Sequence, residues 1–196
     1  IDANDISAIG YPTYPLLNGN MQLGFSWKGF DLSIFLNFSI GNKVYSANKM
    51  YYTKFNNQWR NTLKDEALSR FTVMNAKGEY IFNDPVQLAE VNRNRNYVSI
   101  EGSSDLYFHS GYVEDGSFLK INNISLGYTL PRELTKKIKL STVRFYATGY
   151  NLHTFTKYSG YDPEVNTYPN NGLTPGIDWG AYPSSISFVF GANIAF

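Results

Sequence analysis

The chain has 196 residues, and its 17 Lys and Arg nearly balance its 16 Asp and Glu, so the composition gives no case for nucleic-acid binding. Cysteine is absent, which excludes disulfides and thiolate metal sites. No apolar run approaches the ~18 residues of a membrane helix, although membrane barrels cross with alternating strands whose hydropathy averages out. The chain begins at Ile1 and carries no signal-peptide pattern, so we expect a mature product or a piece of a longer chain.

The first regular pattern is a pair of alternating segments at 21–28 and 30–40, which follows a loop rich in Gly and Pro. Lys28-Gly29 lies between them, and a two-residue turn with Gly second is typical of a tight hairpin. Such a turn pairs Trp27 with Phe30 and places the apolar residues of both segments opposite one another. The predicted apolar face carries Met21, Leu23, Phe25, Trp27, Phe30, Leu32, Ile34, Leu36 and Phe38.

Residues 41–116 lack a clear two-residue period and are rich in Asn, Tyr and charged side chains. One short helix is predicted within them, with an apolar side made of Leu63, Ala67, Leu68, Phe71 and Met74. So long an irregular connection is uncommon in a compact soluble domain, but the extracellular side of an outer-membrane barrel permits it.

A third strand is predicted over 117–130, where Ile124, Leu126, Tyr128 and Leu130 alternate with polar or small residues. The alternation breaks before Asn123, which predicts either a bulge or the membrane boundary there. The connection 131–141 carries four basic residues, and a basic patch is one interpretation. We favour a solvated turn whose Leu134 and Ile138 tuck inward.

The fourth strand is predicted over 142–152, with Val143, Phe145 and Ala147 on one parity. Arg144 lies on the other parity, and a charge directed toward lipid costs roughly 2–4 kcal/mol at the bilayer midplane. We therefore assign Arg144, Tyr146, Thr148 and Tyr150 to the water-filled side, and residues 153–182 to another long loop.

The last strand is predicted over 184–196, where apolar Ile186, Phe188, Phe190, Ala192, Ile194 and Phe196 alternate with small or polar residues. No charged residue follows Asp178, and an uncharged terminal strand is an aggregation hazard in a soluble protein. The alternative is an inner strand of a soluble β-sandwich, which would be a carbohydrate-binding module. The connections between the five predicted strands alternate between short and long, which favours the barrel, with Phe188, Phe190, Ile194 and the hairpin's apolar face toward lipid.

Four segments carry a family resemblance. They are 114–131, which begins EDGSFLK, 151–165, which contains YSGYDPEV, 176–183, and Ile9-Gly10 with the two prolines that follow. In this order they resemble the C-terminal end of the SusC/RagA family of TonB-linked outer-membrane transporters, over nearly the whole chain. The likeness is weakest over 56–110, and the role of that loop is left open.

The resemblance implies a large barrel with an N-terminal plug, in the outer membrane of a Gram-negative bacterium. It also implies a SusD-like surface lipoprotein as lid, energy from the TonB complex, and import of oligosaccharides or oligopeptides. Five strands cannot close a barrel, because the smallest known forms need about eight. We therefore expect residues 1–196 to be all-β antiparallel strands from the C-terminal part of that barrel, with long extracellular loops.

Catalytic chemistry finds little support in the sequence. His109 and His153 have no metal-ligand spacing, and no phosphate loop, nucleophile elbow or dinucleotide motif occurs. Asp162 with Glu164, or Glu114 with Asp115, is the only suggestion of a hydrolase, and contacts to sugar or water are favoured. We predict no enzyme, cofactor or metal, and a substrate path along Arg144, Tyr146, Tyr150, Tyr158, Tyr161, Asp162, Trp179 and Tyr182.

The terminal Phe196 shares the lipid parity with Ile194 and the other apolar residues of its strand. The resemblance implies that such a strand is the signal read by the barrel-assembly machinery. The alternative is that Phe196 only contributes burial, worth roughly 1.5–3 kcal/mol.

Overall fold

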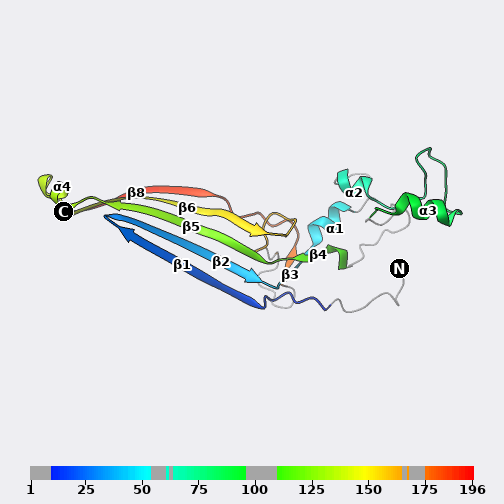
Figure 1. Cartoon of the computed structure of the whole chain (residues 1–196), viewed down its shortest axis with the longest axis horizontal. Helices are drawn as coiled ribbons and strands as arrows, with labels where there is room; N and C mark the ends of the chain where they lie inside the picture. The colour runs from blue at the N-terminus through cyan, green and yellow to red at the C-terminus, as the bar shows by residue number, and fades with distance from the viewer. Residues whose placement is uncertain (1–9, 54–60, 62–63, 96–109, 165–166, 168–174) are drawn as a thin grey trace. The chain divides into compact units, whose positions relative to one another are not determined.

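The computed structural model describes residues 10–53, 61, 64–95, 110–164, 167 and 175–196 (Figure 1). The chain divides into two compact units. The sheet unit contains residues 1–45 and 113–196, and the insert unit contains residues 46–112.

The sheet unit is built on a five-stranded antiparallel sheet with the strand order β1-β2-β5-β6-β8 (Figure 1). The five predicted strands are confirmed, and each of them pairs with the next one along the chain. Two run further than predicted, because β1 already begins at Leu17 and β6 continues to Thr156. The strands are β1 (Leu17–Trp27), β2 (Phe30–Ile40), β5 (Phe118–Thr129), β6 (Thr142–Thr156) and β8 (Ser187–Ala195).

The β1–β2 connection is the predicted two-residue turn. Lys28 and Gly29 have φ angles of 47° and 90°, and positive values at both positions are what a type I′ turn requires. A Cβ on Gly29 would lie 2.7 Å from the carbonyl oxygen of Thr129, so glycine is also required by space. Trp27 and Phe30 are direct partners, which confirms the predicted register.

The break in the pattern of β5 is a β-bulge, as predicted. The pairing with β2 and β6 shifts register between Ile121 and Asn123. Beyond the shift Ile121 lies opposite Leu36 and Leu119 lies opposite Phe38, so the apolar residues stay together on one face. One extra residue therefore returns the apolar side chains before Asn123 to the same face as those after it.

A second, three-stranded sheet was not predicted. It has the order β4-β3-β7 and consists of β3 (Lys43–Ser46), β4 (Val113–Asp115) and β7 (Ile177–Asp178). Next to it, the Gly116 amide donates to the Asn42 carbonyl oxygen at 2.9 Å, and the Gly41 amide donates to Ser117 Oγ at 2.9 Å. The two ends of the long 41–116 connection are thus bound to each other, and treating that connection as irregular was wrong.

The short connection between β5 and β6 contains helix α4 (Arg132–Lys137), at the same end of the sheet as the Lys28-Gly29 turn (Figure 1). Leu134 and Ile138 are 50% and 60% exposed, so the prediction that they tuck inward was wrong. The residues buried here are Thr135 and Val143. The helical periodicity of α4 turns its small Thr135 toward the strand, which a reading based on hydrophobicity alone could not foresee.

The insert unit contains α1 (Ala47–Thr53), α2 (Lys64–Leu68), α3 (Pro85–Asn92) and the 3₁₀ helix η2 (Ser110–Tyr112). Asp84 caps α3 by accepting hydrogen bonds from the Val86 and Gln87 amides. The predicted helix is present only as α2. Phe71 and Met74 lie beyond its end, and Leu63 lies outside the described residues. Within the described residues, no helix is long and apolar enough to cross a membrane.

Candidate functional site: the polar face of the sheet

The five-stranded sheet separates apolar and polar side chains onto opposite faces. Cross-strand pairs on the apolar face include Leu32 with Leu126, and Ala147 with Phe190. The large side chains at the two sides of this face are solvent-exposed, with Trp27 at 69% and Phe190 at 78%, whereas most of those of the inner strand β2 are partly covered. The register places every predicted apolar residue of β1, β2 and β8 on this face, namely Met21, Leu23, Phe25, Trp27, Phe30, Leu32, Ile34, Leu36, Phe38, Phe188, Phe190 and Ile194.

An ion pair crosses the polar face near the end with the short turns. Arg144 Nε and Nη2 donate to the two carboxylate oxygens of Asp31 at 3.0 and 2.6 Å. Gly127 lies between them, and a Cβ there would come within 2.4 Å of the guanidinium. The guanidinium also lies 5.3 Å from the ring centre of Tyr146, whose own ring is accommodated by Gly191. The two glycines thus leave room for Arg144 and Tyr146, both of which the sequence assigns to this face.

A second charged cluster lies on the polar face toward the other end of β5. Lys120 is buried, and its Nζ contacts Glu164 at 2.5 Å and Asp162 at 3.9 Å. It also donates to Ser184 Oγ at 3.1 Å, while Asp162 accepts from the Glu164 and Ser184 amides. The Lys120 cluster, defined as these four residues, therefore fastens two separate parts of the 157–186 connection onto strand β5.

Tyr158 is an internal anchor of the same connection. Its hydroxyl donates to Asp178 Oδ2 at 2.6 Å, and both side chains are buried. Asp178 Oδ1 accepts from the Gly180 and Ala181 amides. A Cβ on Gly160 would come within 2.4 Å of the Tyr158 ring, so the ring is held on that side too. These contacts assign Tyr158 a structural role in holding the connection together.

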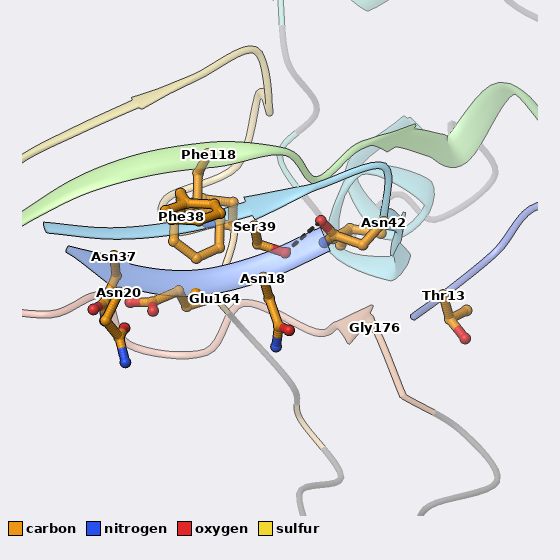
Figure 2. A pocket seen from close by; sticks show the side chains of 13 residues that line it. Thr13, Asn18, Asn20, Asn37, Phe38, Ser39, Asn42, Phe118, Glu164 and Gly176 are labelled. Carbon is orange, nitrogen blue, oxygen red and sulfur yellow. Dashed lines mark hydrogen bonds between the residues drawn. The ribbon is translucent and has the colours of Figure 1, made fainter. Parts of the chain in front are cut away.

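A polar pocket of about 590 Å³ lies beside the Lys120 cluster, where β1 and β2 meet the longer connections (Figure 2). Four asparagines line it, three of them on strands: Asn18 and Asn20 from β1, and Asn37 from β2, while Asn42 follows the end of β2. Asn20 and Asn37 are direct cross-strand partners. Glu164, Ser39 and Phe118 also line the pocket. The Asn37 Oδ1 atom is buried and has no hydrogen-bond partner among the described residues.

The predicted substrate-path residues do not gather at one place. Arg144, Tyr146 and Tyr150 share the polar face of β6, while Tyr158 and Asp162 are buried in the contacts described above. The aromatic residues of the connection are exposed, with Tyr161 at 75%, Trp179 at 41% and Tyr182 at 92%. The sequence analysis missed Lys120 and the pocket asparagines, because residues 18 and 20 precede the predicted first strand and only Asn37 lay within a predicted strand.

The carboxylates once considered for hydrolysis have structural partners. Asp115 accepts from the Ser117 hydroxyl and amide and lies 3.9 Å from Lys43, and the Ser117 hydroxyl is the main cause of the lowered pKa of Asp115. Glu114 accepts from the Ser159 amide and hydroxyl. His153 packs edge-on against Phe155, and His109 lies outside the described residues. The described part of the chain contains no group of residues suited to a metal ion.

Comparison with known proteins finds TonB-dependent receptors as relatives, although no family model matches the chain. It is 32% identical over 200 residues to TonB-dependent receptor P3 of Formosa agariphila, a match that covers all of this chain and 18% of that protein. It is 27% identical over its full length to TonB-dependent receptor SusC of Bacteroides thetaiotaomicron and covers 16% of it. The chain thus spans less than a fifth of these relatives' length.

Solved structures give the same result for the fold. The RagAB peptide transporter matches with a TM-score of 0.76 at 24% identity. The RagAB peptide importer in its closed-closed state matches with a TM-score of 0.74 at 27% identity. Each match covers all of this chain and 19% of the solved chain, so the described sheet corresponds to one part of a larger protein.

Proposed function

Because the chain belongs to the SusC/RagA family of TonB-dependent receptors, we propose that it forms the C-terminal part of a barrel wall in an outer-membrane importer of oligomeric nutrients. The apolar face meets lipid and the polar face lines the lumen. The remaining strands, the plug and the segment that contacts TonB belong to other parts of the protein.

The observation that carries this proposal is the exposed apolar face. Its aromatic and aliphatic side chains run across all five strands, and those of Phe25, Trp27 and Phe190 are more than half exposed. Burying one such side chain is worth roughly 1.5–3 kcal/mol, so water is a poor solvent for a face of this kind. The Asp31–Arg144 pair and the Lys120 cluster lie on the opposite face, where charge meets water.

The strand order favours a barrel wall over the soluble carbohydrate-binding sandwich. In the five-stranded sheet each strand pairs with the next strand of that sheet along the chain, as in an up-and-down barrel, whereas sandwiches commonly use Greek-key crossovers between two sheets. A hydrolase receives no support, because Asp162 and Glu164 are both bound to Lys120.

The partners follow from the relatives and are part of the proposal. SusC and the two-component RagAB importers support a SusD-like lipoprotein that covers the extracellular mouth of the barrel. We place the 41–116 and 155–182 connections on that side, and the Lys28-Gly29 turn and α4 on the periplasmic side. The cargo is an oligosaccharide or an oligopeptide, and the TonB complex supplies the energy.

Cysteine accessibility tests the orientation of the two faces. Single cysteines replace Phe25 and Phe190 on the apolar face, and Ser33 and Thr148 on the polar face, in the full-length protein in outer-membrane vesicles. A water-soluble maleimide is expected to label the polar-face cysteines, while a lipid-soluble quencher acts only on fluorophores attached to the apolar face. Uniform labelling of all four positions would contradict the proposed wall.

A further inference from the structure

We infer that the pocket lined by Asn18, Asn20 and Asn37 binds the main chain of an extended peptide, preferentially a neutral or basic one. This inference rests on the proposed function, since it needs the polar face to line the substrate path. It assigns a ligand class to the asparagine pocket itself.

The unpaired Asn37 oxygen is the observation that indicates a ligand site. Asn37 lines the pocket (Figure 2), and its buried Oδ1 atom accepts no hydrogen bond from any described residue. Leaving a buried acceptor without a donor is unfavourable by about 1–3 kcal/mol. Ser39, by contrast, already donates to Asn42 Oδ1 at 2.9 Å, and Lys120 is fully engaged with its cluster. An entering N–H group would satisfy Asn37.

The spacing of the asparagines fits a peptide backbone. Asn18 and Asn20 are two residues apart on β1 and share a face, so their attachment points are about 6.8 Å apart. An extended peptide repeats its main-chain groups at the same two-residue interval. Each carboxamide carries a carbonyl oxygen that accepts and an NH₂ group that donates, in one plane, which complements the N–H and C=O groups of a peptide unit.

The composition of the pocket favours a peptide over a glycan. Sugar sites commonly stack the sugar ring on an aromatic face, and Tyr or Trp would suit that role. The described lining contains neither of these residues, and its aromatic residues are Phe118 and Phe38, whose side chain belongs to the apolar face. Phe38 is already held against Gly19, where a Cβ would lie 3.0 Å from its ring.

The charge of the neighbouring cluster adds a preference. Two carboxylates, Asp162 and Glu164, face one ammonium, Lys120, so the formal charge is −2 + 1 = −1. Glu164 also lines the pocket, and 34% of its side chain is exposed. An acidic peptide side chain would be repelled here, whereas a basic one would be attracted.

Peptide capture by the full-length protein in detergent tests the inference. Immobilised protein is incubated with a tryptic digest of casein, and separately with malto-oligosaccharides, and retained molecules are quantified by mass spectrometry. The tested variant is Asn20→Ala/Asn37→Ala. Gln22→Ala is the matched control, because Gln22 is the next side chain on the same face of β1 but lies outside the pocket. Asn37→Gln, a milder change, is added in case the double variant assembles poorly.

Wild-type protein and Gln22→Ala are expected to retain peptides, with Asp- and Glu-rich sequences depleted. The double variant is expected to retain at least tenfold less, since each lost hydrogen bond is worth about three- to tenfold. Equal retention by all variants, or no peptide retention by wild type, overturns the inference. Retention of malto-oligosaccharides in place of peptides overturns the peptide class. Uniform maleimide labelling of the four cysteine positions, by contrast, overturns the proposal that the sheet is part of a barrel wall.

Discussion

Removing the charge of Lys120 tests whether the Lys120 cluster holds the long 157–186 connection against the sheet. The change is Lys120→Met, which keeps most of the side-chain volume and removes the ammonium. It leaves Asp162 buried without a cation and leaves Glu164 beside it with the same sign of charge. The strand pairing of β5 is unaffected, because Lys120 contributes to it only through its backbone.

The size of the effect follows from burial. Removing one partner from a buried ion pair destabilises a structure by about 3–5 kcal/mol. The Asp162 side chain is 9% exposed and cannot easily reach water, but that of Glu164 is 34% exposed and can turn outward. We therefore expect the lower end, about 3 kcal/mol, which corresponds to a roughly 150-fold increase in local opening.

Hydrogen exchange of the full-length protein in detergent measures that opening. Peptides covering 157–164 and 182–187 report on the amides of Glu164 and Ser184, both of which donate to Asp162. Lys136→Met is the control, since Lys136 is an exposed lysine of α4. The double variant Lys120→Met/Asp162→Asn removes the stranded charge and should recover much of the protection.

Two results would refute this reasoning. Unchanged exchange in Lys120→Met would mean that the cluster does not hold the connection. A double variant no better protected than Lys120→Met would mean that lost packing, not an uncompensated carboxylate, explains the effect.

Three further outcomes are expected. Gly160→Ala should reduce the free energy of unfolding by about 1–3 kcal/mol and so lower the melting temperature, because the added Cβ collides with the buried ring of Tyr158. An unchanged melting curve would argue against a structural role for Tyr158. Because the pKa of Asp115 is lowered, its hydrogen bonds to Ser117 stabilise the fold above about pH 4, and this stability is lost as pH falls through the folded-state pKa. Hydrogen exchange of the Ser117 amide, relative to its intrinsic rate, should accelerate over that pH range in wild type but not in Asp115→Asn. Phe196→Ala should reduce the amount of assembled barrel in cells far more than its thermal stability, and a proportional loss of both would reduce Phe196 to packing.

Alternation and turn chemistry were enough to predict the five-stranded sheet. The register of the first hairpin follows from Lys28-Gly29 alone, because a type I′ turn fixes which residues face each other. The bulge near Asn123 was predictable for a similar reason, since two apolar residues out of phase require one extra residue to keep a single apolar face.

The contacts of the long connections were not predictable from the sequence. Strands β3, β4 and β7 contain only two to four residues, which is too short for a period to be visible. The Lys120 cluster joins side chains 42 and 64 residues apart along the chain, and no local pattern marks such pairs. The asparagine pocket was missed because Asn18 and Asn20 precede the segment predicted as the first strand, and because strand alternation does not show which polar residues the connections enclose.

The bonds between Gly41, Asn42, Gly116 and Ser117 have a consequence for how such a receptor can diversify. They join the two stretches of chain that flank residues 46–112, and β2 and β5, which precede and follow those stretches, pair directly with each other. The free energy of joining two strands depends only weakly on loop length, with each doubling of the loop costing about 0.6 kcal/mol.

Residues 46–112 can therefore lengthen, shorten or be exchanged between paralogues while the pairing of β2 with β5 stays the same. A different segment needs only to begin after Asn42 and end before Gly116, where the bonded residues hold the two chain ends together. The arrangement separates two evolutionary pressures, because the strand pairing can stay constant while the sequence of residues 46–112 varies.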